Sequence, residues 1–440
     1  MLASLPVLGA FCLRAQTPAS NVPALNLNVP GPGAGAGSSG GAFIGVADDA
    51  TAIYWNPAGL SRVGFENGVI NQAMISGRMQ SRSATSSELN QTYSSTFAPN
   101  YAAVTIGFQD SQMDNIGWVV GLAYQSVSDG NNYKLTEDIL AGPKRISRSI
   151  DSRANLSTVS ACFSHAPNET FSYGLTANYW FGLGGGYNFS QNNATDGLIE
   201  TGSGKLSYSG LNFTLGAMLS LKAEQDIPLR VGLRLTTPFK LKNKYEYSSN
   251  IANQKRGVDF QNYQNYAQKY AIPLSIGLGV SYAFGELEAL RVAADVEYTL
   301  YANQILSQDF YDYTQQNGFS GPKAVNKSLV ATDTEQPYSG GSTLQLRGGI
   351  LYNFQMEQFN LPIRLGYRLA PTTFANLNGS PVASASICGG MGLDFSGLRV
   401  DFAFERNAYT QTIALPQFSL PESTLKSSAN FITVAVTKYF

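Results

Sequence analysis

The sequence comprises 440 residues, of which 13% are charged and 12% are aromatic, with a formal net charge of -1 at pH 7. Soluble domains usually carry about twice that charged fraction, and nucleic-acid-binding proteins present a basic face, so the composition argues against both classes. No apolar run reaches the roughly 18 residues that a transmembrane helix needs. Few charges and many Tyr and Phe residues are typical of membrane-spanning strands with aromatic girdles.

The N-terminus predicts a signal peptide over residues 1–15, because an apolar stretch ends near the small residue Ala15. No basic residue precedes Arg14, so we expect an incomplete signal whose true start lies upstream. A lipoprotein signal at Cys12 lacks the small residue before the cysteine. Cys162 and Cys388 then remain, and two distant cysteines predict no disulfide framework.

Residues 16–66 differ in composition from the rest of the chain. A Pro-rich stretch is followed by a Gly-rich run over 31–41, which lacks the Lys-Ser/Thr ending of a phosphate-binding loop. Asp48 or Asp49 is expected to cap one helical turn that Asn56-Pro57 ends. The sequence therefore predicts an N-terminal unit over 16–66 and a second domain over 67–440.

The second domain repeats an alternation of apolar and polar residues with a period of two. One example places Val400, Phe402 and Phe404 opposite Arg399, Asp401 and Glu405. A period of two indicates strands with two unlike faces. Apolar faces that meet lipid and polar faces that meet a lumen are typical of a transmembrane β-barrel, as is the terminal Phe440.

Alternation and turn residues predict fourteen strands, an even number as in bacterial barrels. The expected ranges are 67–80, 100–109, 115–128, 152–165, 170–183, 205–221, 229–243, 270–284, 290–305, 342–354, 361–370, 382–395, 398–409 and 430–440. Short turns alternate with long loops, and both chain ends are expected at the short-turn side. The predicted fold class is all-β, a fourteen-stranded antiparallel transmembrane barrel.

Charged residues cluster on the lumenal face of the later strands. A salt-bridge network that fills the barrel is one interpretation. Carboxylate binding is the other, because an arginine fork suits a carboxylate. The candidate residues for carboxylate binding are Arg230, Arg234, Arg347, Arg364 and Arg368.

The stretch Gly40–Leu60, which reads GGAFIGVADDATAIYWNPAGL, resembles the N-terminal signature of the FadL-type outer-membrane transporters of long-chain fatty acids and hydrocarbons. The resemblance implies a fourteen-stranded barrel closed by an N-terminal hatch, whose motif here is Asn56, Pro57 and Ala58. It also implies a lateral gap at the third strand, where Gly117 and Gly121 lie, although these glycines could simply make room for plug side chains. The barrel subunits of type IX secretion share a similar signature, so fold is carried over more safely than function.

The resemblance implies a passive importer of hydrophobic compounds in the bacterial outer membrane, with sideways exit through the barrel wall. Asn56 is expected to bond backbone groups left free near Gly117–Gly121, which would couple the plug to the gap. The alternative is a non-transporting scaffold for type IX-like secretion or surface attachment. Expected partners are a hydrophobic ligand, membrane lipid and the barrel-assembly machinery, reached through the strand ending in Phe440. No enzyme activity, cofactor or metal is expected, since His165 is the only histidine and no metal spacing occurs.

Overall fold

The computed structural model describes residues 30–440 apart from short gaps at 64–68, 88, 110–116, 128–132, 142–143, 154, 183–184, 222–226, 256, 286–288, 301–304, 319–320, 329–333, 338–341, 376–380 and 416–419. The expected signal peptide at 1–15 and the Pro-rich stretch up to residue 29 lie outside the described residues. Within the described part, no helix is long and apolar enough to span a membrane.

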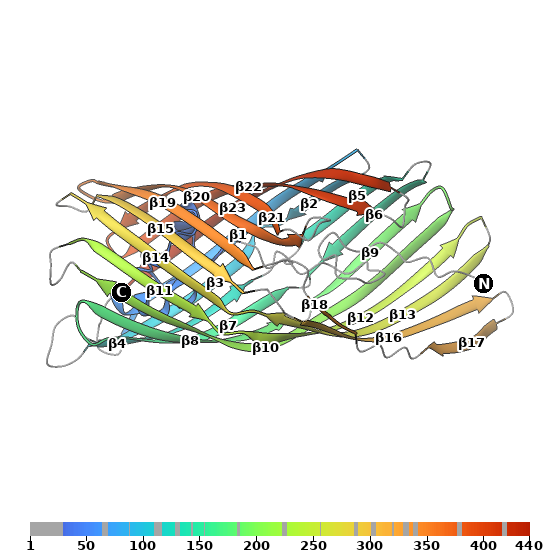
Figure 1. Ribbon diagram of the computed structural model, residues 1–440, viewed down its shortest axis with the longest axis horizontal. Coiled ribbons are helices and arrows are strands. Elements are labelled where there is room, and N and C mark those ends of the chain that lie inside the picture. The colour runs from blue at the N-terminus through green and yellow to red at the C-terminus, as the bar shows by residue number, and fades with distance from the viewer. Residues whose placement is uncertain are drawn as a thin grey trace.

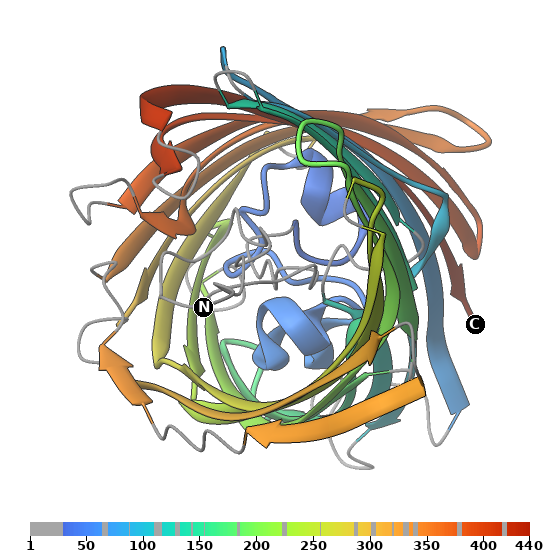
Figure 2. The same ribbon diagram turned by 90° about the vertical axis from the view of Figure 1, so that its right-hand side faces the viewer.

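Fourteen antiparallel strands form a closed ring, which confirms the predicted fold class (Figures 1 and 2). The first strand pairs with the last, so the barrel has no free edge in the hydrocarbon region. In ring order the strands are β1 (Val69–Thr85), β3 (Ala98–Gln109), β4 (Gly117–Ser126), β7 (Leu156–Ala166), β8 (Phe171–Gly182), β10 (Leu198–Ser220), β11 (Leu229–Thr236), β14 (Ser275–Phe284), β15 (Leu290–Thr299), β19 (Thr343–Gln355), β20 (Asn360–Ala375), β21 (Pro381–Phe395), β22 (Leu398–Leu415) and β23 (Leu420–Tyr439).

The segments predicted as long loops contain further strands, and in this respect the prediction is wrong. These strands pair with one another and with the long ends of β1 and β10, and so continue the wall beyond the ring as an outer extension (Figure 1). The extension consists of β2 (Leu89–Ser95), β5 (Tyr133–Ala141), β6 (Lys144–Ser152), β9 (Gly186–Asn193), β12 (Phe239–Asn253), β13 (Val258–Ile272), β16 (Ile305–Gly318), β17 (Gly321–Ser328) and β18 (Thr334–Pro337). On β9 and β12 the exposed residues are polar, so these two strands do not present an apolar outward face to lipid.

The faces of the ring strands follow the predicted alternation. On β4, Val119 is fully buried, whereas Trp118 and Leu122 on the other face are 40% and 58% exposed. On β8, the outward face is aromatic at both ends, from Phe171 to Phe181. Ten residues at about 3.3 Å each, tilted by roughly 40°, span about 25 Å, which is the usual height of a barrel's apolar band.

Residues 30–63, here called the plug, lie inside the ring (Figure 2). The plug contains the short helices α1 (Ala34–Ser38) and α2 (Ala52–Trp55) and the 3-10 helix η1 (Pro57–Arg62). The expected helical turn before Asn56-Pro57 is α2, and it is preceded by Thr51 rather than by Asp48 or Asp49. Nearly all plug residues are buried, so the plug and the inner wall form one packed core.

Candidate functional site: the plug and its contacts with the wall

Glycines on the inner face of seven strands allow the plug backbone to approach the wall directly. A Cβ atom added at any of them would overlap a plug atom, which is one reason glycine occurs where two backbones come close. Each wall glycine and its neighbour in the plug are Gly174 with Pro57, Gly216 with Asn56, Gly232 with Ile44, Gly279 with Gly45, Gly349 with Ser39, Gly366 with Gly40, and Gly390 with Ser38.

The plug contributes glycines of its own at this contact. Gly40 has a φ of 68° and Gly41 a φ of 76°, a region that other residues rarely adopt. A Cβ on Gly40 would lie 2.8 Å from the backbone nitrogen of Tyr367 in β20. The glycine pair therefore meets both a conformational and a steric requirement.

Polar side chains of the wall bond the plug backbone. The Asp295 carboxylate accepts hydrogen bonds from the backbone nitrogens of Phe43 and Ile44, at 2.7 and 2.8 Å. From the opposite side of the ring, the Tyr101 hydroxyl donates to the carbonyl oxygen of Ala50 at 2.7 Å. Because a plug inside a barrel has few regular ladder partners, these side chains satisfy backbone groups that would otherwise be buried and unpaired.

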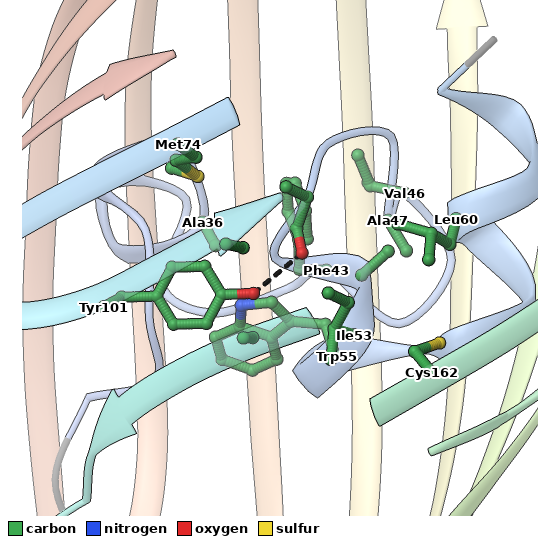
Figure 3. Close-up of a cluster of buried hydrophobic side chains, with 14 of the residues drawn as sticks. Ala36, Phe43, Val46, Ala47, Ile53, Trp55, Leu60, Met74, Tyr101 and Cys162 are labelled. Atoms are coloured by element: carbon green, nitrogen blue, oxygen red, sulfur yellow. Dashed lines mark hydrogen bonds between the residues drawn. The ribbon is translucent and has the colours of Figure 1, made fainter. Parts of the chain in front are cut away.

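A hydrophobic cluster joins the two helical parts of the plug to the wall (Figure 3). Trp55 is 2% exposed, contacts Phe43 edge-on, and donates its indole nitrogen to the carbonyl oxygen of Pro32 at 3.0 Å. Met74 and Cys162 line the wall side of the same cluster. Burial of these side chains fixes the fold of the plug itself as well as its position.

Four of the five arginines considered for carboxylate binding are paired with carboxylates of the wall. Arg347 and Arg234 both lie next to Glu297, at 2.5 and 3.5 Å. Arg364 pairs with Asp401 at 2.8 Å, and Arg368 pairs with Glu405.

The same guanidinium groups contact the plug. Arg234 lies over the ring of Tyr54 and Arg347 lies over the ring of Trp55, 5.0 and 5.5 Å from the ring centroids. Cation–π contacts of this kind stabilise a packed aromatic side chain. The arrangement supports the salt-bridge interpretation, in which the arginines hold wall and plug together.

Arg230, the fifth arginine, belongs to a group of charges around two neighbouring plug carboxyls. Burial alone would raise the pKa of Asp48, but Arg291, whose guanidinium is 2.5 Å away, and then Arg230 outweigh it and lower that pKa. Burial, followed by the charge of Asp48, raises the pKa of Asp49. Asp48 is therefore the carboxylate that anchors this part of the plug to the wall.

The hatch-motif residue Asn56 bridges the plug and β10. Its amide nitrogen donates to the carbonyl oxygens of Ile44 and Ala217, at 2.9 and 3.2 Å, and its amide oxygen accepts from the nitrogen of Ala58. The expected bonds to free backbone groups near Gly117–Gly121 are wrong. Pro57 packs against Gly174, and the carbonyl of Ala58 accepts from Ser164, so the whole motif holds the plug in place.

The strand with Gly117 and Gly121 keeps its ladder partners. Over its described length, β4 pairs in continuous register with β3 on one side and with β7 on the other. A Cβ on Gly121 would lie 2.8 Å from the side chain of Ile53. This contact supports the alternative interpretation, in which Gly121 makes room for the plug.

A second apolar cluster lies in the outer extension. Ile150, Tyr187, Phe189 and Leu206 are each less than 5% exposed and come from β6, β9 and β10. On β10, Leu206 lies on the same face as the lumenal residues of the ring. At this cluster, the inner face of the extension is apolar.

Residues with potential reactivity are not assembled into a site in the described part of the chain. His165 faces outward and its Nδ1 lies 3.2 Å from the hydroxyl of Tyr173. Cys162 and Cys388 are both buried. No group of three or more His, Cys, Asp or Glu residues there is arranged to hold a metal ion.

Sequence reasoning missed the most distinctive part of this site, the ring of inward glycines. The sequence does contain a signal for these glycines, because each occupies one of the alternate positions that are predicted to face the lumen in a strand with clear apolar–polar alternation. A run of wall glycines on one face predicts close backbone approach, and the plug is the segment that supplies it.

Comparison with known proteins gives a family and a fold. A family model described as BamG matches residues 38–405. No curated protein sequence matches the chain.

Among solved structures, the Pseudomonas putida toluene transporter TodX is 15% identical with a TM-score of 0.61, covering 95% of this chain and 100% of that one. The Ralstonia pickettii toluene transporter TbuX is 13% identical with a TM-score of 0.60, covering 94% and 99%. A Pseudomonas aeruginosa FadL homologue is 12% identical with a TM-score of 0.61, covering 95% and 100%. Likeness at this identity establishes a shared FadL-type fold.

Proposed function

The chain belongs to the BamG family, and from this premise we propose that it is an outer-membrane scaffold that acts with the barrel-assembly machinery rather than as an open channel. The family designation points to barrel assembly. The FadL-type fold supports placement in the outer membrane of a Gram-negative bacterium, with the short turns in the periplasm. This role corresponds to the scaffold alternative, with the barrel-assembly machinery as the partner.

The observation that carries this proposal is the immobilised plug. Passage through the lumen would require the plug backbone to leave seven wall glycines and two bonds to Asp295. It would also break the ion pair of Asp48 with Arg291 and remove the aromatic rings that lie over Arg234 and Arg347. A scaffold needs a rigid, closed barrel and requires none of these contacts to break.

A gene deletion tests the proposal by comparing two phenotypes in one strain. Loss of the protein should lower the amounts of several other outer-membrane barrels together, measured by heat-modifiable migration on gels. Uptake of labelled toluene and of a labelled fatty acid should stay unchanged in the same cells. Normal levels of the other barrels, together with a clear loss of uptake, would overturn the scaffold proposal.

Transport of hydrophobic compounds with lateral exit is the second candidate function. The solved structures of similar fold include two toluene transporters, and the apolar cluster inside the outer extension is a suitable surface for a hydrophobic ligand. Transport would require an exit elsewhere than at β4, whose described residues are paired on both sides. Replacing Phe189 with Asp should abolish uptake if this candidate is correct and leave barrel assembly unchanged.

A further inference from the structure

The outward face of the wall changes from apolar to basic along one line across β8, β10 and β12. On β10, the outward residues Phe213 and Leu211 are followed by Ser209 and Ser207 and then by Lys205. Leu211 pairs with Tyr179 of β8, whose side chain is 54% exposed. The upper limit of the apolar band therefore lies between Leu211 and Ser209 on this side of the barrel.

Exposed basic side chains gather directly beyond this limit. Ser209 of β10 pairs with Lys242 of β12, and Ser207 pairs with Lys244. Lys205 pairs with Gly186 of β9, whose carbonyl oxygen accepts from the backbone nitrogen of Arg153. The basic patch comprises Arg153, Lys205, Lys240, Lys242 and Lys244, all of which are exposed.

The positive charge of the basic patch is only partly compensated by the wall. Glu246 pairs with Lys205. Asp151, two residues before Arg153, pairs with Asn188 and lies farther from the apolar band than Arg153 does. None of the five basic side chains forms an ion pair with another described residue. Three lysines at alternate positions on β12 project from one face, so they repel one another unless an anion lies between them.

We propose that the basic patch binds the phosphate groups of an anionic lipid of the outer leaflet, with the acyl chains of that lipid against the apolar surface below. The apolar surface is formed by Tyr179, Leu211 and Phe213, which lie on the membrane side of the lysines. A ligand with phosphates above and acyl chains below matches both surfaces, whereas a soluble anion matches only the first. The inference depends on the outer-membrane placement proposed above but not on a role in barrel assembly.

The site would bind by charge and by apolar contact together. A lysine near a membrane surface contributes about 1 kcal/mol to the binding of anionic lipid, which corresponds to roughly a fivefold change in affinity. Removal of two lysines should therefore weaken lipid retention by about 25-fold.

The test uses native mass spectrometry of the purified full-length barrel in detergent micelles doped with bisphosphorylated lipid A. Wild-type protein should retain lipid A, and Lys242→Gln/Lys244→Gln should retain about 25-fold less. The matched control is Arg145→Gln/Lys255→Gln, which removes two exposed charges that both lie beside Thr195, farther from the apolar band. Because both variants alter exposed side chains, both should fold, and heat-modifiable migration verifies this.

Two further arms separate lipid phosphate from other sources of affinity. Dephosphorylated lipid A should be retained weakly by every variant, and inorganic phosphate added with phosphatidylcholine should give no comparable adduct. Equal retention by wild type and by the Lys242→Gln/Lys244→Gln variant would overturn the proposal, as would equal retention of dephosphorylated lipid A. The assay contains no assembly partner, so its failure is distinct from a failure of the scaffold proposal.

Discussion

At the scale of single residues, the plug is held by side chains that serve backbone groups. Asp295 accepts two plug N–H groups, and Asn56 bridges the carbonyl oxygens of two different segments. Both side chains are buried, and a buried donor or acceptor without a partner costs about 1–3 kcal/mol. Such residues set the position of the plug more strictly than apolar contacts do, because hydrogen bonds have direction.

Replacing Asp295 with Ala should loosen the plug without unfolding the barrel. Two buried N–H groups would lose their acceptor, at a cost of about 1–3 kcal/mol each. We expect faster proteolysis within residues 40–50 of the folded variant. Mass spectrometry of the fragments measures the rate and place of cleavage. Asp295→Asn is the control, since its amide oxygen still accepts, and an unchanged cleavage rate in Asp295→Ala would contradict this role.

Asn56→Ala should release the plug from β10. The variant loses one acceptor and one donor that together serve three backbone groups, and the expected destabilisation is about 1–3 kcal/mol. Hydrogen exchange at Ala58 and at neighbouring plug amides should accelerate. Asn56→Asp keeps the acceptor for Ala58 and should preserve that amide's protection. If both variants exchange like the wild type, the motif does not anchor the plug.

At the scale of elements, the contact between wall glycines and plug explains why the lumen is closed. Every wall glycine in this contact lies on the inner face, and several are adjacent across the ladder, as Gly349 is to Gly366. Glycine weakens a strand. The close approach of plug and wall at these glycines therefore carries a cost to the stability of the sheet.

A paired substitution isolates the role of these glycines. Gly366→Ala places a methyl group on the backbone of Gly40, whereas Gly348→Ala, on the neighbouring strand, meets nothing within 4 Å. Overpacking of this kind costs about 1–3 kcal/mol, and here the obstacle is backbone that cannot change rotamer. We expect Gly366→Ala to lower the temperature of heat-modifiable unfolding and Gly348→Ala to leave it unchanged. Equal midpoints would show that the plug adapts freely.

The ring strands could be predicted from the sequence because each presents an apolar face to lipid. All fourteen expected ranges overlap the observed ring strands, although β10, β22 and β23 are longer. The extension strands were missed because their exposed residues are polar, as on β9 and β12, so they lack the apolar outward face that marks a lipid-facing strand. β9 does alternate, with Tyr187 and Phe189 buried, but its apolar face points inward, the reverse of a ring strand.

The sequence predicted which residues of the candidate site face inward. It could not predict which of them are in contact, because that depends on their positions in space. The alternation of apolar and polar residues predicted that Arg234, Arg347, Arg364 and Arg368 face the lumen. Their pairing with Glu297, Asp401 and Glu405 follows from strand register, which sequence does not specify. The partners of Asn56 lie on β10 for the same reason, since the path of the plug decides which strand it meets.

At the scale of the whole molecule, the ring, the plug and the extension have different surfaces and separate tasks. The ring presents an apolar band to lipid, the plug fills the lumen near the short-turn end, and the extension carries the wall outward (Figures 1 and 2). A barrel of fourteen strands is wide enough for an aqueous passage if its interior is not filled. Whether the plug moves therefore decides between the two candidate functions.

Conductance across a planar lipid bilayer directly measures whether the plug leaves the lumen. Wild-type protein should insert without forming a stable open channel, because the plug and its hydrogen-bonded partners occupy the lumen. The Asp295→Ala/Asn56→Ala double variant removes anchors on β15 and β10, on two sides of the plug, and should show frequent channel openings. Gly348→Ala, whose substitution leaves the plug contacts intact, should remain silent. Steady conductance in the wild type would mean that the plug leaves the lumen under ordinary conditions, and transport would then become the better-supported function.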